Sequence, residues 1–171
     1  MQLVLDLDGI KTKIKIDDYM PNFSLNINSE FDNCMTYVDL SSDYINYTFN
    51  GMFLKSFEVE YLKRELKNVL NDKTRVEKQI EFLNPTVMFE LQPSGDIITN
   101  IENGEYINCD CSGEFVISII KDGRLSSNEL RLFMVKDELK ALYDYLRVVT
   151  HEITEDDNLV CIYKKKGIFI Q

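Results

Sequence analysis

The chain has 171 residues, of which 44% are hydrophobic and 28% are charged. This length and balance are typical of one folded globular domain, here residues 1–171, and they argue against a disordered or collagen-like chain. The 29 acidic and 19 basic side chains give a formal net charge of −10. An acidic surface repels phosphate backbones and anionic lipid headgroups, so nucleic acid and membranes are disfavoured as partners and a basic protein is favoured.

Two features of the sequence favour a cytoplasmic location. No apolar run approaches the roughly 20 residues that a transmembrane helix needs, and the opening MQLVLDLDGIK lacks the positive charge of a secretory signal. The four cysteines are few for a chain long enough to build a core without disulfides. We therefore expect free thiols at Cys34, Cys109, Cys111 and Cys161.

The placement of glycine predicts a sheet rich in hairpins. Four of the seven glycines follow Asn or Asp, and such pairs accept positive φ and close tight turns. These pairs are Asp8-Gly9, Asn50-Gly51, Asn103-Gly104 and Asp122-Gly123. Apolar residues alternate with other residues over 3–7 and again over 10–16, which predicts two strands with one buried face. Further strands are predicted at residues 44–49, 52–55, 86–92, 97–101, 113–120, 129–135 and 159–163.

Two segments change to helical spacing, at residues 57–71 and 137–151. Each carries one apolar stripe with charged residues outside it. Ser56 is a candidate N-cap of the first helix, and Glu58 suits the positive end of its dipole. The predicted fold class is α+β, a mainly antiparallel sheet with two amphipathic helices packed on it.

The two strand–helix segments align at an offset of 80 residues. The alignment is consistent with an internal duplication, but any two units of this kind would align on their apolar stripes, so both readings stay open. The aligned apolar residues are Phe53, Leu62, Leu66 and Val69 in the first unit and Phe133, Leu142, Leu146 and Val149 in the second.

The stretch LVLDLDGI resembles the opening of haloacid-dehalogenase phosphatases, where an apolar strand precedes Asp-x-Asp-Gly. The resemblance would make Asp6 the nucleophile and Asp8 the general acid, both beside Mg²⁺. That family continues with a loop and a helix in a parallel α/β core. Here KTKIKI follows at once, which indicates the return strand of a hairpin. We therefore interpret Asp6 and Asp8 as turn and edge residues.

The remaining reactive side chains predict no metal site and no catalytic centre. Cys109 and Cys111 could present two thiolates on one side of a strand, but zinc would need two more ligands. Cys34 and Cys161 stand alone in apolar, strand-like segments, which is typical of inert buried thiols. His151, the one histidine, is interpreted as a cation near a helix C-terminus.

The acidic residues are concentrated in part of the chain. Residues 86–115 hold six acidic side chains and no Lys or Arg, and residues 1–50 hold eight acidic and three basic side chains. The helical segments are nearly balanced. One interpretation is a docking surface for a basic protein, with Tyr106 as an aromatic anchor; the other is acidity that only confers solubility. The predicted partner-binding residues are Glu90, Asp96, Glu102, Glu105, Tyr106, Asp110 and Glu114.

The segment QIEFLNPTVMFELQ carries Phe82, Pro85, Phe89 and Glu90 in the spacing of a Phe-x-x-Pro step followed by a Phe-Glu strand. In this respect, and in the order of elements over residues 44–149, the chain resembles the WapI family of immunity proteins. The resemblance implies a non-catalytic bacterial protein without cofactors, which binds and neutralises a polymorphic toxin domain, often a basic nuclease. The alternatives are a general acidic interaction or structural module and a Mg²⁺-dependent phosphatase. The oligomeric state stays open.

Overall fold

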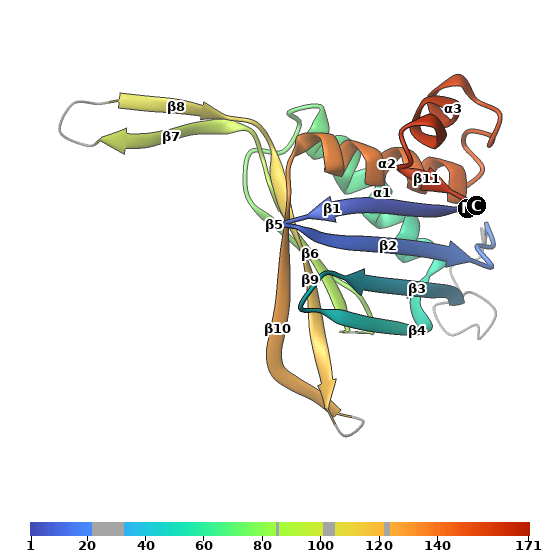
Figure 1. Ribbon diagram of the computed structural model, residues 1–171. Coiled ribbons are helices and arrows are strands. Elements are labelled where there is room, and N and C mark those ends of the chain that lie inside the picture. Colours follow the sequence, from blue (N-terminus) through green and yellow to red (C-terminus); the bar gives the residue numbers. More distant parts are fainter. Residues whose placement is uncertain (22–32, 85, 101–104, 122–123) are drawn as a thin grey trace.

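The structure is a computed structural model that describes residues 1–21, 33–84, 86–100, 105–121 and 124–171. It contains two antiparallel sheets, a separate two-stranded ribbon and three helices (Figure 1). This arrangement confirms the predicted fold class, an α+β fold with mainly antiparallel sheet. No helix within the described ranges is long and apolar enough to cross a membrane.

The first sheet is a meander of four strands with one short strand added at its edge, in the order β11-β1-β2-β3-β4. Its buried side is made by alternate residues such as Leu3, Leu5 and Leu7, because successive residues of a strand face opposite sides. The strands are β1 (Gln2–Leu7), β2 (Ile10–Asp17), β3 (Asn33–Ser41), β4 (Asn46–Lys55) and β11 (Phe169–Ile170).

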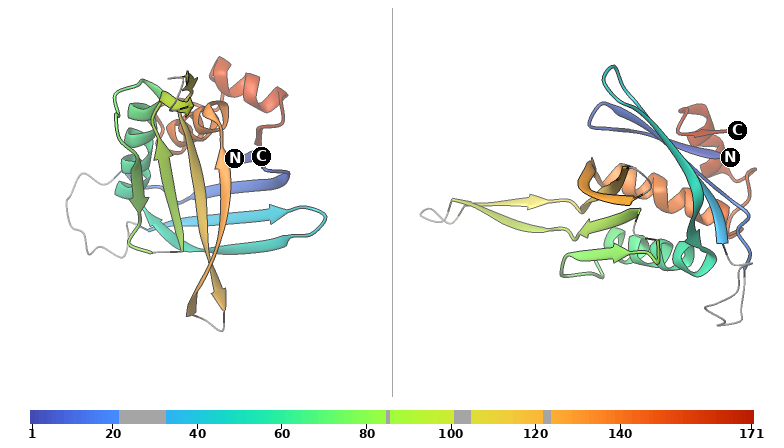
Figure 2. Two further views of the ribbon diagram at one scale, coloured as in Figure 1. Left: turned by 90° about the vertical axis from the view of Figure 1, so that its left-hand side faces the viewer. Right: turned by 90° about the horizontal axis from the view of Figure 1, so that it is seen from below.

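The second sheet has four strands in the order β10-β9-β6-β5. They are β5 (Lys78–Glu81), β6 (Val87–Gln92), β9 (Ser112–Lys121) and β10 (Arg124–Met134). Between β6 and β9 the chain forms a ribbon of two further strands, β7 (Gly95–Asn100) and β8 (Glu105–Cys109). This ribbon extends away from the rest of the molecule in Figures 1 and 2.

Each sheet is followed along the chain by a long helix. Helix α1 (Ser56–Leu70) comes directly after β4, and α2 (Lys136–Val149) comes directly after β10. They lie side by side and contact strands of both sheets, as the right-hand view of Figure 2 shows. The apolar stripe predicted for each helix forms the centre of the core, where Leu66 and Leu146 are fully buried.

The predicted turn at Asp8-Gly9 is confirmed. Both residues have positive φ, 54° and 77°, and they join strands whose last pair is Leu7 with Ile10. The residues 103–104 and 122–123, which hold two more of the predicted turns, lie outside the described residues.

The predicted turn at Asn50-Gly51 is wrong. Both residues lie inside the continuous strand β4, with Gly51 opposite Thr36. The chain turns earlier, where the Ser42 N–H donates to the Ile45 carbonyl at 2.8 Å. An Asn-Gly pair permits positive φ but does not require it, so pairing with β3 decides the conformation.

The strand predicted at residues 159–163 is also wrong, because this segment lies in helix α3 (Asn158–Lys165). The Asp157 side chain caps the helix by accepting the Leu159 N–H at 2.9 Å. A short apolar run does not distinguish a strand from a buried helix. The helical conformation buries Val160 but leaves Cys161 exposed, so the prediction of a buried thiol holds for Cys34 and fails for Cys161.

The N-terminus of α1 begins one residue earlier than predicted. Lys55, not Ser56, is the N-cap residue, and its N–H donates to Glu58 Oε2 at 2.8 Å. The strands β3, β5, β8 and β11 were not among the predicted strands.

Candidate functional site

The outward side of the second sheet carries a set of acidic residues that the sheet brings together from three strands. Strand alternation places Phe89 and Phe115 on the side facing the helices, where their rings stack with centroids 4.8 Å apart. Glu90 follows Phe89 and Glu114 precedes Phe115, so in this antiparallel pair the two glutamates are directly opposite each other on the outward side. We call this surface the acidic face; it consists of Glu90, Glu114, Glu129, Arg131 and Phe133.

Arg131 lies at the centre of the acidic face. Its Nη1 is 2.9 Å from Oε2 of Glu90 and 2.9 Å from Oε2 of Glu114, and its Nη2 is 3.1 Å from Oε2 of Glu129. The hydrogen bonds that the guanidinium donates to these three carboxylates raise its pKa, so it stays charged. Two carboxylates directly opposite each other would repel, so Arg131 stabilises their close approach. Three carboxylates around one guanidinium still leave the face negatively charged.

An exposed aromatic side chain lies next to these charges. Phe133 is opposite Glu114 in the strand register and is 44% exposed. Its N–H donates to Asp8 Oδ2 at 3.0 Å, which connects the β1–β2 turn to β10. Aromatic side chains are enriched at the centres of protein interfaces, whereas carboxylates belong to the polar rim around them.

The structure brings some of the predicted partner-binding residues together and separates others. Glu90 and Glu114 belong to the acidic face. Asp110 lies where the ribbon returns to the sheet, and its Oδ1 is 2.8 Å from Lys136 Nζ. Asp96 lies in β7, and Glu105 and Tyr106 lie in β8, whereas Glu102 lies outside the described residues.

Four residues of this region escaped prediction from the sequence: Glu129, Arg131, Phe133 and Lys136. The segment 86–115 contains no Lys or Arg, yet the fold supplies it with two cations from later in the chain. Arg131 reaches the glutamates only because β10 pairs with β9, and this long-range pairing leaves no local signal in the sequence.

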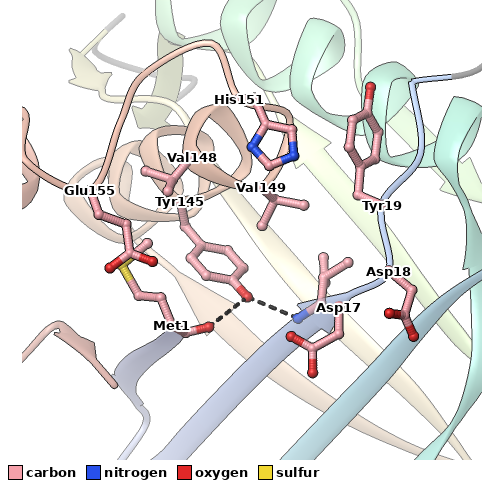
Figure 3. A pocket seen from close by; sticks show the side chains of 10 residues that line it. Met1, Asp17, Asp18, Tyr19, Tyr145, Val148, Val149, His151 and Glu155 are labelled. Atoms are coloured by element: carbon pink, nitrogen blue, oxygen red, sulfur yellow. Dashed lines mark hydrogen bonds between the residues drawn. The ribbon is translucent and has the colours of Figure 1, made fainter.

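A concave region lies between the end of β2 and the end of α2 (Figure 3). This cavity has a volume of about 270 Å³. The Tyr145 hydroxyl, fully buried at its edge, accepts the Ile16 N–H at 2.9 Å and donates to the Met1 carbonyl at 3.4 Å. Burial raises the pKa of Tyr145, so the hydroxyl stays neutral and hydrogen-bonds the backbone of Met1 and of Ile16 in β2.

His151 lines the same cavity, where Figure 3 shows it above Tyr145. It lies just beyond the C-terminus of α2, as the sequence predicts, and its ring meets the Tyr19 ring edge-on at 6.1 Å between centroids. Its neighbours in the cavity are acidic, aromatic and aliphatic, and among the described residues no serine or cysteine nucleophile lines this cavity.

The structure gives no support to a metal centre within the residues it describes, where no group of three or more His, Cys, Asp or Glu is placed to hold an ion. Cys109 is partly exposed, whereas Cys111 is buried and its thiol pKa is raised by that burial. Asp6 and Asp8 are exposed on an antiparallel hairpin, not at the end of a buried parallel strand. The structural context that the phosphatase resemblance requires is therefore missing from the described sheets.

Comparison of the chain with protein-family models, with curated proteins and with solved structures finds no match.

Proposed function

We propose that this protein is a cytoplasmic immunity protein that binds a basic toxin domain and neutralises it by covering its surface, without chemistry of its own. The observation that carries the proposal is the acidic face, where three glutamates surround one arginine beside the exposed Phe133. The resemblance of residues 44–149 to WapI immunity proteins supports the same function.

The geometry of the face indicates how a basic partner would bind. Glu114 and Glu129 are partly exposed, with 36% and 39% of their side chains accessible, and Arg131 engages one oxygen of each. The second oxygen of each carboxylate can accept a hydrogen bond from a lysine or arginine of the toxin. Negative charge accelerates the encounter, and Phe133 provides apolar area that charge alone does not supply.

The proposal is tested by co-expression with the product of the adjacent upstream gene, which the proposal takes to be the toxin, in a sensitive bacterial host. The intact chain should restore growth and co-purify with the toxin in a one-to-one complex. The double variant Glu114→Gln, Glu129→Gln removes two charges from the acidic face and should slow association by about tenfold.

A matched control removes two charges elsewhere. Asp43→Asn and Glu77→Gln alter exposed residues outside the acidic face and should change the association rate less than about twofold. If the intact chain neither restores growth nor forms a complex, the general acidic interaction module is favoured instead. If both double variants associate equally slowly, the acidic face is excluded as the binding surface.

A further inference from the structure

Strand β4 forms a free edge of the first sheet. The order β11-β1-β2-β3-β4 makes it the outermost strand, as Figure 1 shows, and among the described strands it pairs only with β3. An edge strand presents a row of backbone N–H and C=O groups with which another strand can pair. Natural proteins therefore shorten their edge strands, or place charged residues, proline or bulges in them.

The turn before β4 shows which backbone groups face this edge. The Ser42 N–H donates to the Ile45 carbonyl at 2.8 Å, so these two residues form a hydrogen-bonded pair across the hairpin. Hydrogen-bonded and non-hydrogen-bonded pairs alternate along antiparallel strands, so Tyr47 and Phe49 bond to β3. The residues between and beside them direct their N–H and C=O groups away from β3, and we call them the β4 edge. They are Asn46, Thr48 and Asn50.

The other long edge strand, β10, is protected in ways that β4 is not. The Phe133 N–H donates to Asp8 Oδ2 at 3.0 Å, so a side chain from the β1–β2 turn occupies part of the edge of β10. Strand β10 also carries the charged residues Glu129 and Arg131. By contrast, residues 46–54 contain no charged side chain and no proline, although 28% of the whole chain is charged. The β4 edge therefore lacks the charges that keep strands apart.

A bulge limits the length of β4 that can pair with a further strand. Thr36 is opposite Gly51 and Cys34 is opposite Leu54, so β4 holds one extra residue between these two pairs. A bulge bends the strand and interrupts its regular hydrogen bonding. Residues 46–51 precede the bulge and stay in continuous register with β3. The regular part of the strand therefore contains all three residues of the β4 edge.

The charge of the chain indicates which partner fits this edge. Each copy carries a net charge of −10, so two copies repel each other wherever their carboxylates would meet. Pairing along the β4 edge places no charged side chains directly opposite each other. A basic partner gains no ion pair from the same edge, because residues 46–54 offer it no carboxylate. The absence of charge therefore favours a second copy of this chain.

A two-fold axis at Thr48 makes the β4 edge complementary to itself. Two antiparallel copies centred there pair Thr48 with Thr48, and Asn46 of each copy with Asn50 of the other, and each pair exchanges two backbone hydrogen bonds. The same register places Tyr44 of each copy beside Met52 of the other. These side chains are 96% and 59% exposed, so both gain apolar contact that a single chain does not provide. We propose that the β4 edge is a homodimer interface, at which two copies join their first sheets into one continuous sheet.

Sedimentation velocity of the intact chain tests the interface. Between about 1 μM and about 300 μM the average mass should rise from the 20.0 kDa of one chain toward twice that value. The double variant Asn46→Lys, Asn50→Lys changes two exposed residues and places lysines directly opposite each other, so its dimer Kd should be weaker by at least about tenfold. The matched control Gln92→Lys, Gln171→Lys adds the same charge at exposed positions outside β4 and should keep the Kd within about twofold.

A complementary variant tests the register. The variant Asn46→Asp, Asn50→Asp places aspartates opposite each other and should also dissociate into single chains. Mixed in equal amounts with the lysine variant, it should form a heterodimer, because every lysine is then opposite an aspartate. A mixture that associates no better than either variant alone would overturn the pairing of Asn46 with Asn50.

Amide hydrogen exchange of the intact chain tests the interface without any substitution, so the test holds even where a variant does not fold. The N–H groups of the β4 edge should exchange at least about tenfold more slowly at high protein concentration, because the dimer hydrogen-bonds them. The N–H groups of Glu129 and Arg131 are the control. They face the free edge of β10, as the Phe133 N–H does, and their exchange should not depend on concentration.

Two results would overturn the interface. One is an intact chain that stays monomeric up to about 300 μM, with exchange at the β4 edge that does not change with concentration. The other is a dimer that the lysine variant does not weaken, or that slows exchange at β10 and not at β4, because the second copy then binds elsewhere. These experiments contain no toxin, so they test the dimer separately from the proposed immunity function.

Discussion

Glu58 and Glu138 close the N-termini of α1 and α2 with hydrogen bonds of the same length, 2.8 Å from the N-cap N–H to Oε2. They differ in what else they contact. The other oxygen of Glu58 accepts the Leu83 N–H at 2.6 Å, which holds the segment after β5 against the start of α1. Glu138 lies instead near the carboxylates of Asp6 and Asp8. The same capping residue therefore has different energetic consequences in the two halves of the chain.

We expect Glu58→Ala to destabilise the protein more than Glu138→Ala. Glu58 is 4% exposed, and its removal leaves the N–H groups of Lys55 and Leu83 without their acceptor. The expected loss is about 1–3 kcal/mol for Glu58→Ala and about 1 kcal/mol for Glu138→Ala. Urea denaturation of both variants measures the difference. Equal losses would show that the hydrogen bond to Leu83 contributes little.

Glu138 makes stability depend on pH. Burial raises the pKa of its carboxyl, and the nearby Asp8, Asp6 and Asp137 carboxylates raise it further, although the Val135 N–H opposes this. The folded protein therefore holds the proton more tightly than the unfolded chain. The free energy that protonated Glu138 contributes to stability is fully present below the unfolded pKa of about 4.3. It is lost as pH rises through the higher folded pKa.

The variant Glu138→Gln should remove this dependence, because the amide oxygen still accepts the N-cap N–H but does not ionise. The slope of the free energy of unfolding against pH, measured between pH 4 and pH 7, should be more positive in the variant than in the intact protein. Parallel curves for the two proteins would contradict the assignment.

Gly113 allows β9 to approach β6 closely. A Cβ at this position would lie 2.8 Å from the Glu90 carbonyl oxygen and 3.2 Å from a methyl group of Leu139. We expect Gly113→Ala to lower the free energy of unfolding by about 1–3 kcal/mol, because backbone must move. Gly95→Ala is the control, since a Cβ there meets nothing within 4 Å. Similar free energies of unfolding for the two variants would indicate that the β6 backbone moves away from the added methyl group without loss of stability.

Asp144 joins α3 to α2 from a position that is 1% exposed. Its Oδ2 accepts the Tyr163 hydroxyl at 3.0 Å, and Lys140 and Arg147 lie 2.8 Å and 3.1 Å from its carboxylate oxygens. We expect Tyr163→Phe to cost about 1–2 kcal/mol, because a buried carboxylate loses a hydrogen bond. Lys140→Met removes a half-exposed cation and should cost less than about 1 kcal/mol. Denaturation of both variants tests this order, which the opposite ranking would contradict.

Local sequence patterns predicted the elements whose conformation local chemistry decides. Asp8-Gly9 closes a hairpin because the strands on both sides alternate in register, and both helices follow their apolar stripes. Asn50-Gly51 has the same chemistry but lies within β4, where pairing with β3 prevails. The run at 159–163 was too short for its period to distinguish α3 from a strand.

The candidate site was predicted only in part, because its charges come from distant segments. The sequence places Glu90 and Glu114 in an acidic segment, but their direct opposition depends on β6 pairing with β9. Arg131 reaches them from the next strand, so the net charge of the face is smaller than that of the segment alone. The distribution of charge along the sequence therefore predicts the acidic region but not Arg131 within it.

The association rate of this protein with the product of the adjacent upstream gene, measured at low and at high ionic strength, tests the proposed immunity function most directly. The acidic face should steer a basic partner, so the rate constant should fall at least about tenfold as salt rises. The Glu114→Gln, Glu129→Gln variant should already associate slowly at low salt. An association rate that does not change with salt, or the absence of a complex, would contradict the proposed immunity function.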